Sequence, residues 1–390
     1  MEVATGSGGP GVPLRRPPLL PSRLETLLLP AKPRSPLPVP ARALAASLAK
    51  WGAVGLWRVL QPDDRGPYVE TGRPRALSRL YYTASDGWQA PVFHLPACAG
   101  GAGEPVILAH GLGLGPHAAR YGADTLAGAL SDAGFSVYLL AHRGDADAIA
   151  PSPGATPWFD DVVGRDLPAA IERVVAHARY ARALFVGHGL GGQAGLAFAG
   201  AYGGDGLAGL VALGAAVRFR APRSEAGRRA AVLGLLPPWW RLPVGAIGPV
   251  VAPWVDGESA WLDQTVPGSS EGARLRGLLH HGVDDVHLAW FRQLSRWLEA
   301  GSLVDRTGRL DYVEALREAR APLLVCASAG DAVAPPWAAF PAAAAWGGVA
   351  ECRELPPQLG HVDLLTGDAA PDGVFAPIVA WLEAGRRACW

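Results

Sequence analysis

The sequence predicts an α/β protein with a mostly parallel, doubly wound sheet. Short apolar runs of strand length alternate along the chain with longer segments whose apolar residues recur at helical spacing. Such alternation is typical of a sheet whose parallel strands are joined by helices on both of its faces. The expected strands are 77–83, 88–95, 105–109, 135–141, 183–186, 206–213, 322–327 and 350–355, and the expected helices are 118–133, 163–178 and 374–387.

The two earliest strands are expected to differ from the rest. Ser85, Asp86 and Gly87 separate the runs 77–83 and 88–95. Asp-Gly between two apolar runs is a strong signal for a hairpin turn. We therefore expect an antiparallel hairpin at the leading edge of the sheet.

A long interruption at 215–319 separates the strands 206–213 and 322–327. It has several helical runs and no convincing strand, so it is expected to form a helical cap over the edge where a site would open. Its tryptophans form either the cap's own core or the wall of an apolar pocket that suits acyl or lipid-like ligands. They are Trp239, Trp240, Trp254, Trp261, Trp290 and Trp297.

The N-terminal part of the chain is expected to lie outside the sheet domain. Residues 1–40 are rich in proline, glycine and arginine, which predicts a disordered arm, and they carry no signal-peptide core or cleavage site. Residues 41–60 are apolar at helical spacing, but Lys50 argues against a membrane span. Either this helix docks on the domain, or it makes peripheral contact with a membrane through Trp51 and Trp57. The expected domains are the arm 1–40, an N-terminal helical segment 41–76, the sheet domain 77–214 and 320–390, and the cap 215–319.

Charge and cysteine content narrow the partners and the compartment. The 390 residues carry 35 basic and 35 acidic side chains, so no excess of positive charge favours nucleic acid. The four cysteines have no metal-ligand spacing and are expected to be free thiols of a reducing compartment. We therefore expect a cytoplasmic protein, peripheral to a membrane if 41–60 binds one. The cysteines are Cys98, Cys326, Cys352 and Cys389.

The centre of the chain carries a strand that ends in small residues, G-H-G-L-G-G. It has the outline of G-x-S-x-G, a sharp strand-to-helix turn that exposes a nucleophilic serine above a parallel sheet. Gly187, His188, Leu190 and Gly191 fit this elbow motif. Gly189 stands at the position of the serine.

Three further motifs follow other expected strands. The turn His110-Gly111-Leu112-Gly113 comes directly after the strand 105–109. Asp331 follows 322–327 in the sequence S-A-G-D-A-V, and His361 follows 350–355 in L-G-H-V-D. The order along the chain is glycine-rich turn, elbow, carboxylate and histidine.

These motifs in this order make the chain resemble the α/β-hydrolases, and within that superfamily bacterial esterases and lipases. The resemblance covers about 79–382, apart from most of the cap, and implies the α/β-hydrolase fold without a cofactor. It implies an oxyanion hole made by the amides of Leu112 and Leu190, and a triad acid and base in Asp331 and His361. The alternative for Asp331 is a turn or capping aspartate, and the alternative for His361 is a surface histidine.

Two other polar clusters are interpreted as structural. The cap carries five residues of metal-ligating type, but helical spacing scatters them, so no metal site is expected. Three aspartates before and within the helix that leads to the elbow are explained by the favourable electrostatics of a helix N-terminus. The cap residues are His280, His281, Asp284, Asp285 and His287, and the three aspartates are Asp160, Asp161 and Asp166.

Gly189 decides which chemistry is open to this chain. A covalent acyl-enzyme needs a nucleophilic side chain, which glycine lacks, whereas glycine suits the strained backbone of an elbow. Three functions stay open. The chain binds a small apolar or acyl ligand beneath the cap without catalysis, or His361 and Asp331 activate a water that attacks an ester, or the domain is structural and acts through its proline-rich arm.

Overall fold

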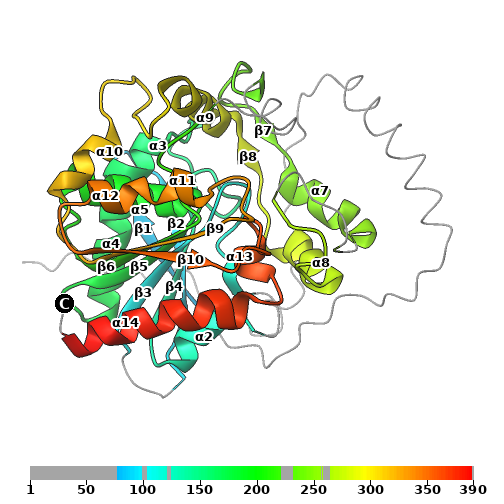
Figure 1. Ribbon diagram of the computed structural model, residues 1–390. Coiled ribbons are helices and arrows are strands. Elements are labelled where there is room, and N and C mark those ends of the chain that lie inside the picture. Colours follow the sequence, from blue (N-terminus) through cyan, green and yellow to red (C-terminus); the bar gives the residue numbers. More distant parts are fainter. Residues whose placement is uncertain are drawn as a thin grey trace, which may run out of the picture. The chain divides into compact units, whose positions relative to one another are not determined.

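A single eight-stranded sheet carries the fold (Figure 1). Its strand order is β1-β2-β4-β3-β5-β6-β9-β10. β1 pairs antiparallel with β2 and β2 antiparallel with β4, whereas all other pairs are parallel. The mostly parallel α/β sheet and its leading hairpin are therefore confirmed. The strands are β1 (Ser78–Thr83), β2 (Gln89–Leu95), β3 (Pro105–Ala109), β4 (Ser136–Leu140), β5 (Ala183–His188), β6 (Leu207–Leu213), β9 (Leu323–Ser328) and β10 (Ala350–Leu355).

The computed structural model describes residues 77–98, 103–120, 124–220, 232–255, 257 and 264–388. The arm expected at 1–40 and the helical segment expected at 41–76 lie outside these residues, as do Trp261 and Cys389. Within the described part of the chain, no helix is both long enough and apolar enough to cross a bilayer.

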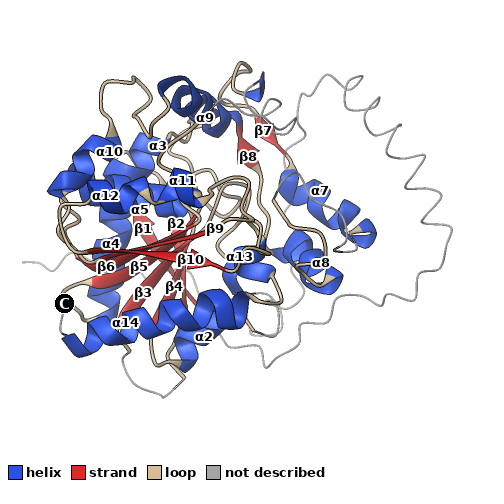
Figure 2. Ribbon diagram, in the orientation of Figure 1, coloured by secondary structure: helices blue, strands red, loops and turns tan. Residues whose placement is uncertain are grey.

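Helices cover both faces of the sheet (Figure 2). α4 and α5 pack on one face, where Ile171 and Leu196 join a large buried apolar cluster. α2 and α14 pack on the other face, where Leu130 and Ile378 belong to a second cluster. Since both faces are covered, every residue of β3, β4, β5, β6 and β9 is buried, which explains their continuous apolar runs. These helices are α2 (Leu126–Asp132), α4 (Leu167–Ala178), α5 (Leu190–Tyr202) and α14 (Ala376–Ala388).

The prediction of a single helix at 118–133 is wrong. A 3-10 turn, η2 (Ala118–Arg120), is separate from α2, which begins after Thr125. The hydroxyl of Thr125 accepts a hydrogen bond from the Gly128 amide at 3.0 Å, as an N-cap residue does. The helix expected before the elbow is likewise composite, with α3 (Phe159–Asp161) and a π-helical turn, η3 (Val162–Asp166), ahead of α4.

The segment expected to form the cap is mainly helical between β6 and β9. It also contains two antiparallel strands of two residues each, β7 (Arg241–Leu242) and β8 (Val286–His287), where no strand was expected. Strands this short show no alternating pattern in a sequence. The remaining elements are α7 (Val244–Val251), η4 (Ala252–Trp254), α8 (Gly272–His281), α9 (Leu288–Ala300), α10 (Tyr312–Ala315) and η5 (Leu316–Glu318).

The tryptophans of this segment serve different purposes. Trp239 is exposed, whereas Trp290 and Trp297 are buried. The Trp297 ring packs edge-on against Phe159 of α3, with ring centroids 4.9 Å apart, and its indole nitrogen donates to the Val304 carbonyl. Trp297 therefore joins α9 to the sheet domain and does not belong to an isolated cap core.

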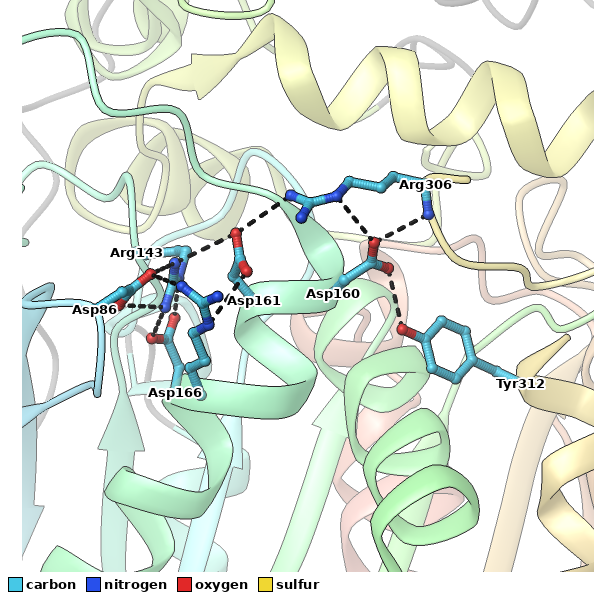
Figure 3. Close-up of polar contacts among 8 residues, drawn as sticks. Asp86, Arg143, Asp160, Asp161, Asp166, Arg306 and Tyr312 are labelled. Atoms are coloured by element: carbon cyan, nitrogen blue, oxygen red, sulfur yellow. Dashed lines mark hydrogen bonds and ion pairs between the residues drawn. The ribbon is translucent and has the colours of Figure 1, made fainter. Parts of the chain in front are cut away.

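A buried arginine, Arg143, binds two of the three aspartates that were assigned to helix electrostatics, whereas Asp160 has separate partners (Figure 3). Arg143 follows β4 and donates from Nε and Nη2 to Asp166, at 2.8 and 2.6 Å. It also donates to Asp86 of the β1–β2 turn at 2.8 Å and lies 3.6 Å from Asp161. Asp160 accepts from the Tyr312 hydroxyl at 3.0 Å. Asp160 and Asp161 lie in the first turn of α3, as expected for helix electrostatics, and all three carboxylates also have specific cationic or hydroxyl partners.

We expect Asp166→Asn to destabilise the fold strongly. Asp166 is fully buried, and removing its charge leaves a buried guanidinium short of one partner, a loss of about 3 kcal/mol. The matched control is Asp147→Asn, since Asp147 forms a half-exposed pair with Arg79 at 3.3 Å and should contribute less than about 1 kcal/mol. Urea unfolding of both variants tests this difference, and equal losses would contradict it.

Candidate active site

The elbow lies where β5 ends and α5 begins. Gly189 has φ 52° and ψ −117°, a region that side chains with a Cβ rarely adopt. Its amide donates to Leu213 of β6 at 2.9 Å, and the Gly191 amide donates to the His110 carbonyl at 3.1 Å. A Cβ at Gly191 would lie 2.5 Å from the Ala109 carbonyl oxygen, so the turn packs directly against the end of β3. The small residues after Gly187 and His188 therefore allow the close approach that the turn needs.

The structure brings Asp331 and His361 together at this edge. Asp331 follows β9 and His361 follows β10, and His361 Nδ1 lies 2.8 Å from Asp331 Oδ2. The other carboxylate oxygen accepts from the amides of Val333 and Ala334, both at 2.8 Å. Burial opposes ionisation, but the His361 charge and these hydrogen bonds outweigh it and lower the pKa of Asp331. Asp331 is therefore an ionised partner that holds the imidazole by Nδ1.

The other ring nitrogen of His361 faces Gly189. A Cβ built on Gly189 would lie 2.9 Å from His361 Nε2 and 3.4 Å from the Gly111 Cα. His361 Nε2 therefore lies at the edge of the space that a side chain at position 189 would occupy. The base position, the elbow and the glycine-rich turn thus meet at one point.

His188 supports the His361 loop, a role that the motif did not predict for it. The two rings are 4.5 Å apart, and His188 Nε2 donates to the His361 carbonyl at 3.0 Å. Burial, with a smaller effect of the His361 charge, lowers the pKa of His188 to about 3. His188 is therefore a neutral positioning residue and not a second base.

The turn after β3 packs against the elbow and carries Leu112, one of the two expected oxyanion donors. Gly111 packs on His188, because a Cβ there would lie 2.8 Å from His188 Nδ1. Leu112 follows on the turn with a partly exposed side chain. Leu190 is the first residue of α5, a position whose amide has no acceptor within the helix. The oxyanion role of the Leu112 and Leu190 amides remains a prediction, and their location at the elbow is compatible with it.

Sequence reasoning missed two buried carboxylates at this edge. Asp363 accepts from the Gly360 amide at 2.9 Å, from the Val266 amide at 2.7 Å and from the Ser270 hydroxyl at 2.6 Å. It thereby ties the His361 loop to the segment that precedes α8. Asp145, which follows β4, lies 2.9 Å from His110 Nε2. The available signal was the position of each residue directly after a strand or beside a motif, where polar residues often serve a site.

The residues of metal-ligating type in the cap are engaged in other contacts. Asp284 accepts from the Ala146 amide at 3.0 Å, and His287 Nε2 accepts from Arg241 at 2.7 Å. Asp285 accepts from the Gly245 amide at 3.1 Å. In the parts of the chain that the structure describes, no group of three or more histidine, cysteine or acidic side chains is arranged to hold a metal.

Comparisons with known proteins agree with this architecture. The family model described as serine aminopeptidase, S33, matches residues 102–267. An esterase from Exiguobacterium antarcticum is 15% identical, with 78% of this chain and 100% of that chain covered at a TM-score of 0.52. The Paleococcus ferrophilus monoacylglycerol lipase is 17% identical, with 80% and 99% covered at 0.50.

A third solved structure is described as a membrane phospholipase A, a novel bacterial virulence factor. It is 15% identical, with 89% of this chain and 96% of that chain covered at a TM-score of 0.52. Among the curated proteins, none matches this chain. At these identities the solved structures establish the fold alone. With the sheet order and the elbow, they show that this chain is an α/β-hydrolase-fold protein.

Proposed function

We propose that this chain binds a carboxylic ester or a related acyl compound at the Gly189 elbow and forms no covalent acyl-enzyme there. The observation that carries the proposal is the position of His361 Nε2, which lies 2.9 Å from where a Cβ on Gly189 would be, while Asp331 is bonded to Nδ1. In a serine hydrolase a hydroxyl lies between the elbow and that nitrogen. Here the base and the orienting acid are in position and the nucleophile is missing.

Exposed apolar side chains that follow two of the sheet strands support an apolar or acyl ligand. Leu112, Val333 and Trp337 are 37, 43 and 43% exposed, although all three are large apolar residues. They follow the strands β3 and β9, at the edge that also carries Asp331. Exposed apolar side chains beside polar groups are typical of a ligand site. The esterase and lipases with the same fold are named for ester substrates, which favours the same ligand class here.

A second function, ester hydrolysis by an activated water, is favoured by the intact His361–Asp331 pair. Water would attack the ester carbonyl carbon while His361 Nε2 accepts its proton, and the imidazolium would return that proton to the alcohol as the carbon–oxygen bond breaks. The products are a carboxylic acid and an alcohol. The amides of Leu112 and Leu190 would stabilise the charge on the carbonyl oxygen. The third interpretation, an interaction role of the proline-rich arm, concerns residues outside the described structure.

The test compares wild type, Gly189→Ser, Gly189→Ala and His361→Ala. We expect no labelling of the wild type by a fluorophosphonate, because it has no elbow hydroxyl, and measurable labelling of Gly189→Ser. Activated esters with short and long acyl chains report hydrolysis. We expect the serine variant to exceed the alanine variant by at least about tenfold, well below the roughly 10⁶-fold effect of the serine in a complete triad.

Wild-type hydrolysis decides between the two candidate functions. Turnover that disappears in His361→Ala identifies water attack. No turnover, together with a thermal shift of the wild type by fatty acids or ester analogues, identifies binding alone. Fluorophosphonate labelling of the wild type at this turn, or neither turnover nor a thermal shift, would overturn the proposal.

The same variants test the backbone of the elbow. Gly189→Ala should destabilise the fold by about 1 to 3 kcal/mol, because φ 52° is strained for alanine and its Cβ meets His361 Nε2. His361→Ala removes the ring, so adding Gly189→Ala to that background should show the backbone strain alone. Urea unfolding measures both steps. An unchanged free energy of unfolding in Gly189→Ala would contradict the strained geometry.

A further inference from the structure

The turn 110–113 is anchored by a buried histidine that the proposed function does not use. Both ring nitrogens of His110 have partners, since Nδ1 lies 3.0 Å from the Gly111 carbonyl oxygen and Nε2 lies 2.9 Å from Asp145 Oδ2. Asp145 Oδ2 also accepts from the His142 amide at 2.6 Å. His110 thereby links the turn that packs on the elbow to the loop that follows β4.

The two contacts of His110 need two hydrogens. A carbonyl oxygen only accepts, so Nδ1 must carry a hydrogen to bond to Gly111. The contact between Nε2 and Asp145 needs a second hydrogen, on the nitrogen or on the carboxyl. A neutral imidazole facing an ionised carboxylate has only one hydrogen for both bonds. The two anchors therefore coexist only while the pair holds one additional proton.

We propose that His110 and Asp145 share this proton and that it holds the turn 110–113 against the elbow, so that its loss releases one anchor of the turn. His110 and Asp145 are positioning residues in this arrangement, because they act on the site through the turn. The consequence for the ligand rests on the proposed function, in which the Leu112 amide of this turn faces the ester carbonyl. The anchoring of the turn does not depend on that function.

Burial sets where the proton sits. Burial raises the pKa of Asp145 to about 7, against the opposing influence of His142 and Arg241, while the charge of Asp147 raises it further. Burial also lowers the pKa of His110 to about 4. The proton therefore resides on Asp145, and the contact is a neutral hydrogen bond below neutral pH. Because the folded pKa of Asp145 exceeds its ordinary value, its stabilisation is complete below about pH 4 and is lost as the pH rises through about 7.

The cap brings a second carboxyl to the same place. The Asp284 amide donates to the Gly113 carbonyl at 3.1 Å, and the Gly115 amide donates to Gly282 at 2.7 Å. Burial and then the charge of Asp145 raise the pKa of Asp284 to about 7. His287 does not offset these carboxyls, since burial and the Arg241 charge lower its pKa to about 3. When both carboxyls lose their protons, their negative charges repel each other. The contact between the cap and the turn is therefore expected to weaken over the same pH range.

Hydrogen exchange of the full chain measures this anchor directly. After correction for the intrinsic chemical rate, exchange in peptides covering 110–115 and 282–287 should rise about tenfold between about pH 6 and about pH 8.5, while β5 stays unchanged. Asp145→Asn has no proton to lose, because its side-chain amide keeps a hydrogen for His110 Nε2 at every pH, so the rise with pH should disappear from both peptides. Asp147→Asn removes a charge that raises the pKa of Asp145, so the rise should move to lower pH. Asp285→Asn, a matched cap variant, should keep the wild-type profile.

Several outcomes would overturn the proposal. They are a wild-type profile without a rise, a rise that survives Asp145→Asn, a rise at unchanged pH in Asp147→Asn, and its loss in Asp285→Asn. If Asp145→Asn does not fold, the wild type and Asp147→Asn still decide. Because exchange is measured without a ligand, failure of the proposed function leaves this result intact. Where a ligand binds, its affinity should fall over the same pH range as the turn loosens.

Discussion

Parallel pairing of the central strands is the constraint on which the site depends. β3, β5, β6, β9 and β10 run in one direction, so the loops that follow them open at the same edge of the sheet. The turn after β3, Gly189 after β5, Asp331 after β9 and His361 after β10 are far apart in the chain and adjacent in space. No local sequence motif contains two of these residues. The alignment of the paired strands therefore sets the distances between these residues.

Two buried carboxylates then connect this edge to the segment between β6 and β9. Asp363 binds Val266 and Ser270 and so fixes the loop that carries His361. Asp284 binds the Ala146 amide, while its own amide donates to Gly113 of the turn. The loop that carries His361 and the turn 110–113 are therefore each held by contacts with both the sheet domain and the cap. Since buried carboxylates need several donors to offset their desolvation, these contacts couple the cap to the site energetically as well as geometrically.

Much of the sheet could be predicted from the sequence because its interior strands are buried on both faces. The run 105–109 has the bounds of β3, since a buried parallel strand is apolar throughout. β10 is instead a mostly exposed edge strand, although the expected run 350–355 also has its bounds. The broken helix at 118–133 was missed because the capping role of Thr125 is visible only with its bond to Gly128. β7 and β8 were missed because two residues carry no periodicity.

Only those residues of the candidate site that belong to family motifs could be predicted from the sequence. Gly189, Asp331 and His361 were identified because each occupies a motif position after a strand. Asp145 and Asp363 were not, and Asp284 was considered only as a metal ligand, because their partners are mainly backbone amides and a histidine from distant segments. A carboxylate that accepts hydrogen bonds from backbone amides has no characteristic spacing in the sequence. Arg143 is a similar case, since its partners Asp86 and Asp166 come from separate elements.

The replacement of a nucleophile by glycine is more than the loss of one hydroxyl. Glycine relieves the strain of a turn at φ 52°, and this gain requires no chemistry. In addition, a Cβ built on Gly189 would lie 2.9 Å from His361 Nε2, so a side chain at this position needs a small shift of the imidazole. The Asp331 carboxylate holds the His361 ring in that place, and the hydrogen bond from His188 to the His361 carbonyl holds its backbone. A serine at this turn would therefore bring the backbone strain of φ 52° and require a small shift of the His361 ring.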